Sequence, residues 1–97
     1  MGIFILIMQT DKFTILLNVE NTDLVFEITE HNNNNIVTYD VIIAEPKGYA
    51  KYHDLEQPLI MKYDPVNGHL VFKSDHDLSN FEDLEYSLSN EIMNRNN

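Results

Sequence analysis

The chain has 97 residues, 16 of them acidic and six basic, which gives a formal net charge of −10. Because it contains no cysteine, disulfide bonds and cysteine-ligated metal sites are excluded. The surplus of acid repels nucleic acids and anionic membranes, so we expect neither as a direct partner and favour a basic protein instead. We expect one domain over residues 1–97, located in the cytoplasm.

An apolar run opens the chain, from Ile3 to Met8. It is too short to cross a membrane, which takes about twenty residues, and it lacks the flanks of a secretory signal. Two interpretations of residues 1–8 stay open. They form an extra N-terminal strand, or they are an extension from an upstream start codon, with Met8 as the biological start. An unpaired strand here would expose backbone groups that can pair with another chain, and would therefore favour a homodimer.

Alternation of apolar and polar residues predicts three strands, over 12–20, 24–30 and 36–44. Residues 21–23 are typical of a turn, and residues 31–35, a histidine followed by four asparagines, predict a polar loop. The residues expected to face the core are Phe13, Ile15, Leu17, Val19, Leu24, Phe26, Ile28, Val37, Tyr39, Val41 and Ile43.

The middle of the chain contains one ambiguous segment and one clear hairpin. Residues 49–57 fit either a short strand over 49–53 or an irregular loop. Strands over 59–63 and 69–73 are then predicted on either side of a turn at 64–68, which begins with an Asp-Pro pair and ends with Asn-Gly. Leu70 and Phe72 are expected to face the core.

The apolar period changes to steps of three and four near the C-terminus, which predicts a helix over 79–94. Ser79 and Glu82 form a capping box at its start, and Arg95 at its end suits the helix dipole. Strands followed by one helix predict an α+β domain, an antiparallel meander of about five to six strands with the amphipathic helix on one face. The apolar stripe consists of Leu78, Phe81, Leu84, Leu88 and Ile92.

One histidine is flanked by two carboxylates, in the triplet Asp75, His76 and Asp77. Nitrogen and oxygen ligands of this kind suit a divalent metal, but no second ligand set follows at motif spacing. The same residues are more simply explained as the entry to the helix, where Asp77 or Ser79 caps backbone amides. No cofactor is predicted, and no nucleophile elbow or phosphate-binding glycine loop is present in the sequence, so we expect no enzyme.

Two segments are the candidates for partner binding. One is the irregular stretch that contains Tyr49 and Tyr52, because tyrosines in long loops are frequent at interfaces. The other is the acidic face expected on the helix, formed by Glu82, Asp83 and Glu85 together with Ser89 and Tyr86.

The sequence therefore predicts a small, acidic, non-catalytic domain that binds a basic protein. A narrower form of this hypothesis is an inhibitor whose carboxylates imitate the charge of a nucleic acid. Two alternatives remain open, a small metal- or ligand-binding domain and a homodimeric structural protein.

Overall fold

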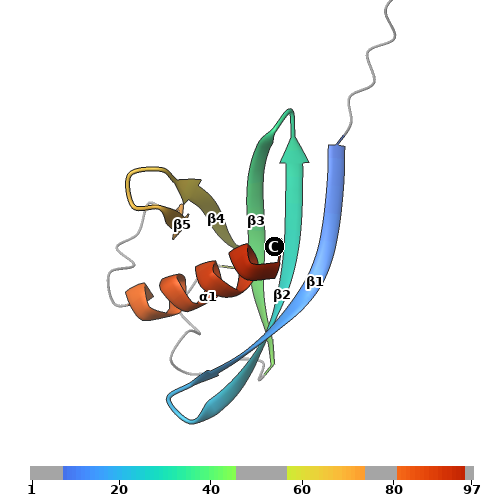
Figure 1. Ribbon diagram of the computed structural model, residues 1–97. Helices are drawn as coiled ribbons and strands as arrows, with labels where there is room; N and C mark the ends of the chain where they lie inside the picture. Colours follow the sequence, from blue (N-terminus) through green and yellow to red (C-terminus); the bar gives the residue numbers. More distant parts are fainter. Residues whose placement is uncertain (1–7, 46–56, 74–80, 96–97) are drawn as a thin grey trace, which may run out of the picture.

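The computed structural model describes residues 8–45, 57–73 and 81–95, which form five strands and one helix (Figure 1). The strands form one antiparallel sheet in the order β1-β2-β3-β4-β5, and the helix packs on it, so the predicted α+β meander is confirmed. The elements are β1 (Met8–Val19), β2 (Thr22–Asn33), β3 (Ile36–Glu45), β4 (Leu59–Asp64), β5 (His69–Phe72) and α1 (Glu82–Arg95).

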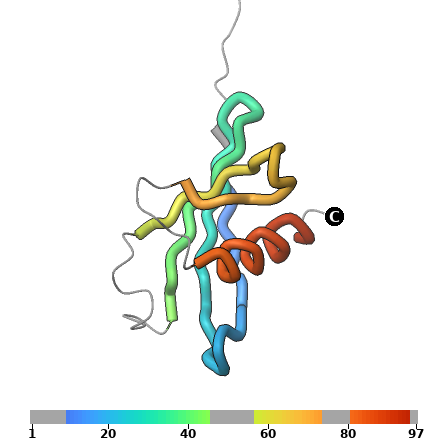
Figure 2. The backbone as a smooth tube through the Cα atoms, turned by 90° about the vertical axis from the view of Figure 1, so that its left-hand side faces the viewer, coloured from blue at the N-terminus to red at the C-terminus, as the bar shows by residue number. Residues whose placement is uncertain are grey.

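The core lies between α1 and the face of the sheet that it covers (Figure 2). Alternate strand residues point to this face, as the sequence pattern predicted, because successive side chains of a strand project to opposite sides. The helix contributes its stripe of Leu84, Leu88 and Ile92. The buried strand residues are Ile15, Leu24, Phe26, Ile28, Tyr39, Val41, Ile43, Leu59, Met61 and Leu70.

The first two strands are joined by a tighter turn than the sequence predicted. Only Glu20 and Asn21 form it, with φ values of 51° and 64°. Two successive positive φ values are typical of a type I′ turn, whose twist matches that of the flanking strands. Thr22 and Asp23, which we expected in the turn, therefore belong to β2, and the Asn18 amide donates a 2.9 Å hydrogen bond to Asp23 across the pair.

The polar loop predicted over residues 31–35 is wrong for most of its length. β2 continues through His31 to Asn33, and only Asn34 and Asn35 form the turn, with φ values of 52° and 67°. Polar residues are tolerated in these strand ends because they are exposed or half-buried there. His31 is also bonded across the pair, its Nε2 lying 3.0 Å from Asp40 Oδ2.

Replacing Asn35 with valine is expected to lower the free energy of unfolding by about 1–2 kcal/mol, because a β-branched side chain is strained at positive φ. Asn33→Val is the matched control, since Asn33 is also exposed but lies in a strand, where valine is favoured. Urea denaturation of both variants checks the expectation. Equal stability of the two would contradict the assigned turn.

The second predicted hairpin is confirmed, and its turn is organised by one carboxylate. Asp64 accepts hydrogen bonds from Val66 N at 2.9 Å and from Asn67 Nδ2 at 2.7 Å. The Gly68 amide donates to the Asp64 carbonyl oxygen at 2.8 Å, and its φ of 74° is the conformation that glycine adopts without strain.

The helix extends one residue beyond its predicted end, to Arg95. Its predicted start at residue 79, the capping Ser79 and the stripe residue Leu78 lie outside the described residues, as do the apolar run before Met8 and the ambiguous stretch 49–53. No helix in the described ranges is long and apolar enough to span a membrane.

Candidate functional site

Strand β5 forms one edge of the sheet, and two of its backbone amides point away from the neighbouring strand. The Lys73 amide, just after β5, donates to the Ile60 carbonyl oxygen at 2.7 Å. Because backbone groups in an antiparallel pair alternate in direction along a strand, Leu70 and Phe72 direct their amides outward. Without partners, two such amides would form an exposed edge that can pair with other chains.

Side chains of α1 seal this edge. The Leu70 amide donates to Ser89 Oγ at 2.8 Å, and the Phe72 amide donates to Glu85 Oε2, also at 2.8 Å. Ser89 is fully buried, so its hydroxyl replaces the bonds that water or another strand would make. One flank of the helix therefore takes the place of a sixth strand.

This geometry corrects the predicted acidic face of the helix. Ser89 was expected on the exposed face, but it is buried against β5. Glu85 is half-buried, and its carboxylate is already engaged by the Phe72 amide. The sequence misplaced both residues because the apolar stripe alone does not reveal which flank of a helix meets a sheet edge.

A different set of exposed residues lies along one side of α1, at helical spacing, and we call this side the outer face of α1. On this face the Tyr86 side chain is 57% exposed, and Met93, about two turns further along the helix, is 38% exposed. Five exposed residues make up this outer face: Glu82, Asp83, Tyr86, Asn90 and Met93.

Tyr86 is held in position although it is exposed. Its ring meets that of His69 edge to face, with centroids 5.8 Å apart and an interplanar angle of 81°. Such contacts are favourable and limit the rotamers of the ring. The His69 ring is itself placed, because Nδ1 lies 2.9 Å from the Leu70 carbonyl oxygen. The tyrosine therefore loses less side-chain freedom when another molecule covers it.

The acidic residues of the outer face are concentrated in the first turn of the helix, where Glu82 and Asp83 are both exposed. Negative charge at this end is favoured by the helix dipole, so these carboxylates stabilise α1 whether or not they bind anything. Together with an exposed aromatic ring and a methionine, they also form an amphipathic surface with charge at one end.

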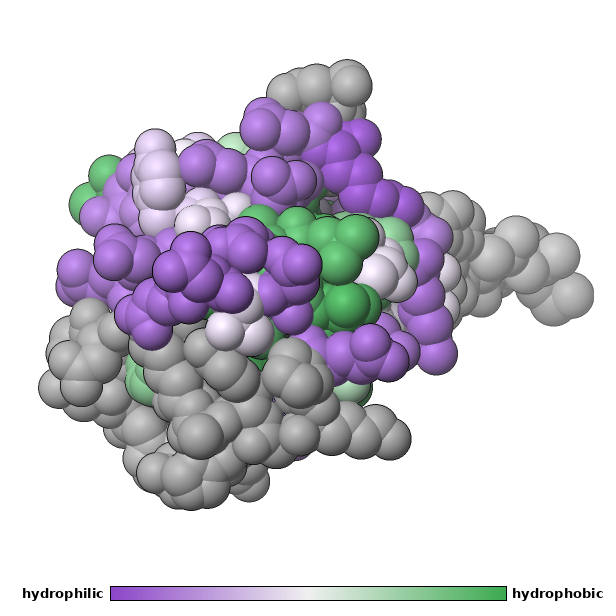
Figure 3. Space-filling model, turned by 90° about the horizontal axis from the view of Figure 1, so that it is seen from below, coloured by the Kyte–Doolittle hydropathy of each residue, from purple (hydrophilic) through white to green (hydrophobic). Residues whose placement is uncertain are grey.

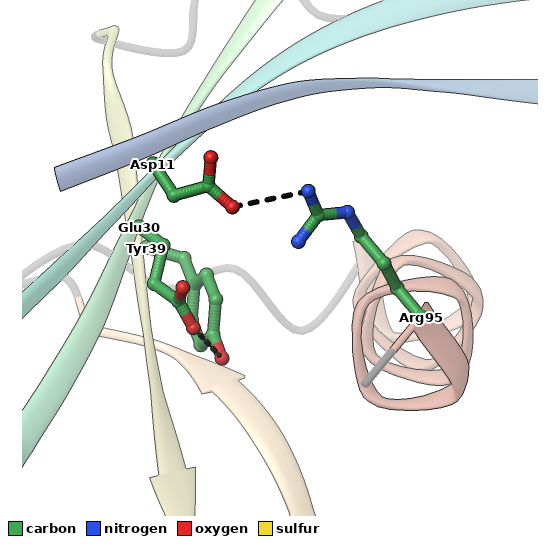
Figure 4. Close-up of polar contacts among 4 residues, drawn as sticks. All are labelled: Asp11, Glu30, Tyr39 and Arg95. Carbon is green, nitrogen blue, oxygen red and sulfur yellow. Dashed lines mark hydrogen bonds and ion pairs between the residues drawn. The ribbon is translucent and has the colours of Figure 1, made fainter. Parts of the chain in front are cut away.

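The C-terminal end of α1 contacts strand β1 of the sheet (Figure 4). Arg95 donates from Nη2 to Asp11 Oδ2 at 3.1 Å, and its guanidinium carbon lies 3.7 Å from the centre of the Phe13 ring. Nearby, the Tyr39 hydroxyl donates to Glu30 Oε1 at 3.0 Å. The Arg95 contacts connect the C-terminal end of the helix to β1, and the Tyr39–Glu30 hydrogen bond joins β3 to β2.

The face of the sheet that points away from α1 carries one histidine–carboxylate pair, His31 and Asp40. Such a pair is the orienting half of many acid–base sites, but it needs a nucleophile or a metal beside it. Within the described ranges, no group of three or more histidine and carboxylate side chains is placed to hold a metal ion. The predicted candidates Asp75, His76 and Asp77, like Tyr49 and Tyr52, lie outside the described residues.

A scan against protein-family models finds no match to this chain, and searches of curated proteins and of solved structures also find none.

Proposed function

We propose that this chain is a non-catalytic interaction domain that binds a basic protein through the outer face of α1. The observation that carries the proposal is the exposure of Tyr86 and Met93 along the same side of α1 as the carboxylates of Glu82 and Asp83. Tyrosine and methionine are enriched at the centres of protein interfaces, whereas charged residues are found at the rim. The outer face has this arrangement on a rigid element.

The overall charge supports a basic partner. A net charge of −10 on 97 residues produces a long-range field that accelerates the approach of a positively charged protein and orients it. The attraction is screened by salt, so binding is expected to weaken as ionic strength rises. The absence of cysteine is compatible with a reducing compartment, and the proposal places the interaction in the cytoplasm.

The double substitution Glu82→Lys with Asp83→Lys is expected to weaken partner binding at least about tenfold at low salt, because it reverses the charge of the outer face. Glu85 stays unchanged in this test, since its carboxylate holds the Phe72 amide. The partner is first captured from the source extract on the immobilised chain, eluted by salt and identified. Its affinity for each variant is then measured with purified proteins by titration calorimetry.

Glu27→Lys with Glu45→Lys is the matched control, because both residues are exposed strand residues and the net charge changes equally. This control should bind nearly as well as the unmodified chain. Tyr86→Ala should also weaken binding, and its effect should persist at high salt because an aromatic contact is not screened. Equal losses of affinity in the two charge-reversal variants would show that binding depends on the net charge and not on a defined contact face. That result would contradict the proposal.

A further inference from the structure

The second edge of the sheet, formed by β1, differs from the sealed edge at β5. Among the described residues, no strand lies beyond β1. Its pairing with β2 runs without a register shift from Met8 to Val19, whereas the pairing of β2 with β3 is irregular at Val25 and Phe26. Protein edges are commonly blunted by proline, bulges, short length or charged side chains. Over its 12 residues β1 has no proline and no bulge, and its two charged residues, Asp11 and Lys12, lie in its first half.

Alternate residues of β1 direct their backbone groups to the side away from β2. In a two-residue hairpin, the residues that flank the turn form a hydrogen-bonded pair, which here is Val19 with Thr22. Odd-numbered residues of β1 therefore bond to β2, and even-numbered residues point outward. The residues with outward groups, all exposed, are Thr10, Lys12, Thr14, Leu16 and Asn18. The Leu16 side chain is 70% exposed and is the one apolar side chain among these five residues.

We propose that the β1 edge pairs with β1 of a second copy of this chain, antiparallel, about a two-fold axis at Leu16. In this register Leu16 faces its own copy and Thr14 faces Asn18, so each outward backbone group between them finds a partner. Antiparallel pairing over these residues forms about six main-chain hydrogen bonds. The two sheets then continue into one, with both helices on the same face.

The core-facing residues of β1 are complementary in the same register. Ile15 faces Leu17 of the other copy, and Phe13 faces Val19, so every cross-strand pair on this side is apolar. Phe13, Leu17 and Val19 are only partly buried in the single chain, and pairing covers them further. Apolar surface is visible between hydrophilic residues when the molecule is seen from below (Figure 3). The segment from residue 13 to residue 19 is therefore self-complementary about its centre.

Charge fits the same register despite the acidity of the chain. Lys12 lies at each end of the paired segment, next to the turn of the other copy that contains Glu20, and opposite charges brought close together are favourable. Asp11 is already bonded to Arg95, so it adds little repulsion at this edge. The β1 edge is therefore close to neutral within a strongly acidic molecule. Because the two copies still repel each other overall, self-association is expected to strengthen with added salt, whereas binding of a basic partner weakens.

The chain contains no cysteine, so the single substitution Leu16→Cys tests the axis directly. Facing residues of a hydrogen-bonded pair have their Cα atoms about 5.5 Å apart, which lies within the range that a disulfide bridges. Mild oxidation of Leu16→Cys should give a covalent dimer in high yield. Ile36→Cys, similarly exposed but at the other hairpin, should stay monomeric under the same conditions. Equal cross-linking of both variants, or of neither, would overturn the proposal.

Sedimentation equilibrium of the unmodified chain should show a monomer–dimer equilibrium that shifts toward dimer as salt increases. Lys12→Glu should raise the dimer dissociation constant about tenfold, and adding Glu20→Lys to that variant should restore it, because opposite charges again lie close together at each end of the paired segment. A chain that stays monomeric at all concentrations would overturn the proposal. The test is independent of the proposed function, since variants of the outer face of α1 leave β1 unchanged.

Discussion

Replacing Leu88 with alanine is expected to lower the free energy of unfolding by about 2–5 kcal/mol. Leu88 is fully buried at the centre of the helical stripe, between Leu84 and Ile92. The substitution removes its contacts with the sheet and leaves a cavity. A domain of this size is stable by about 5–15 kcal/mol, so the loss is a large part of the total. Urea denaturation followed by circular dichroism measures it.

Val66→Ala is the control for the same experiment, because Val66 is 91% exposed in the turn between β4 and β5. It should change the stability by less than about 0.5 kcal/mol, as surface substitutions usually do. A small loss at Leu88, comparable with that at Val66, would mean that the helix does not form the core with the sheet.

Replacing Ser89 with alanine is expected to lower the free energy of unfolding by about 1–3 kcal/mol, because the Leu70 amide then loses its partner at a buried site. Alanine has a higher helix propensity than serine, so the helix itself gains from the change. Any net loss of stability in Ser89→Ala is therefore due to the lost contact between Ser89 and β5. Denaturation by urea is again the measurement, with the dependence on protein concentration followed in parallel.

Ser87→Ala separates this contact from a general effect of serine in the helix. Ser87 lies two residues earlier in α1 and is only half-buried, so its replacement should be neutral or slightly stabilising. If Ser87→Ala and Ser89→Ala were equally stable, the helix would not seal the β5 edge. Self-association of Ser89→Ala at high concentration would agree with an edge that has been opened.

Periodicity in the sequence was sufficient to predict the order of the elements. Alternation identified β1 and β2 near Ile15 and Phe26, and the change of period identified α1. The ends of the strands were less predictable, because polar residues in an exposed β-ribbon have the same composition as a loop. For this reason His31 and Asn33 were predicted to lie in a loop, although they are residues of β2.

The candidate site was predictable only in part. Glu82 and Asp83 are exposed as expected, since they lie far from the apolar stripe on the helix. Ser89 and Glu85 were misplaced because their partners, Leu70 and Phe72, are known only from the position of the helix at the sheet edge. Met93 was not identified as a surface residue, and spacing on the helical wheel relative to Tyr86 could have found it.

Hydrogen exchange of individual amides, followed by NMR at low protein concentration, tests most directly that α1 seals the β5 edge of the sheet, whereas no described residue pairs with the β1 edge. The Leu70 and Phe72 amides should exchange slowly, as in a central strand, because they donate to Ser89 and Glu85. The Thr14 and Leu16 amides should exchange fast, and should become protected as the concentration rises. Equal exchange at both edges in dilute protein would contradict this account.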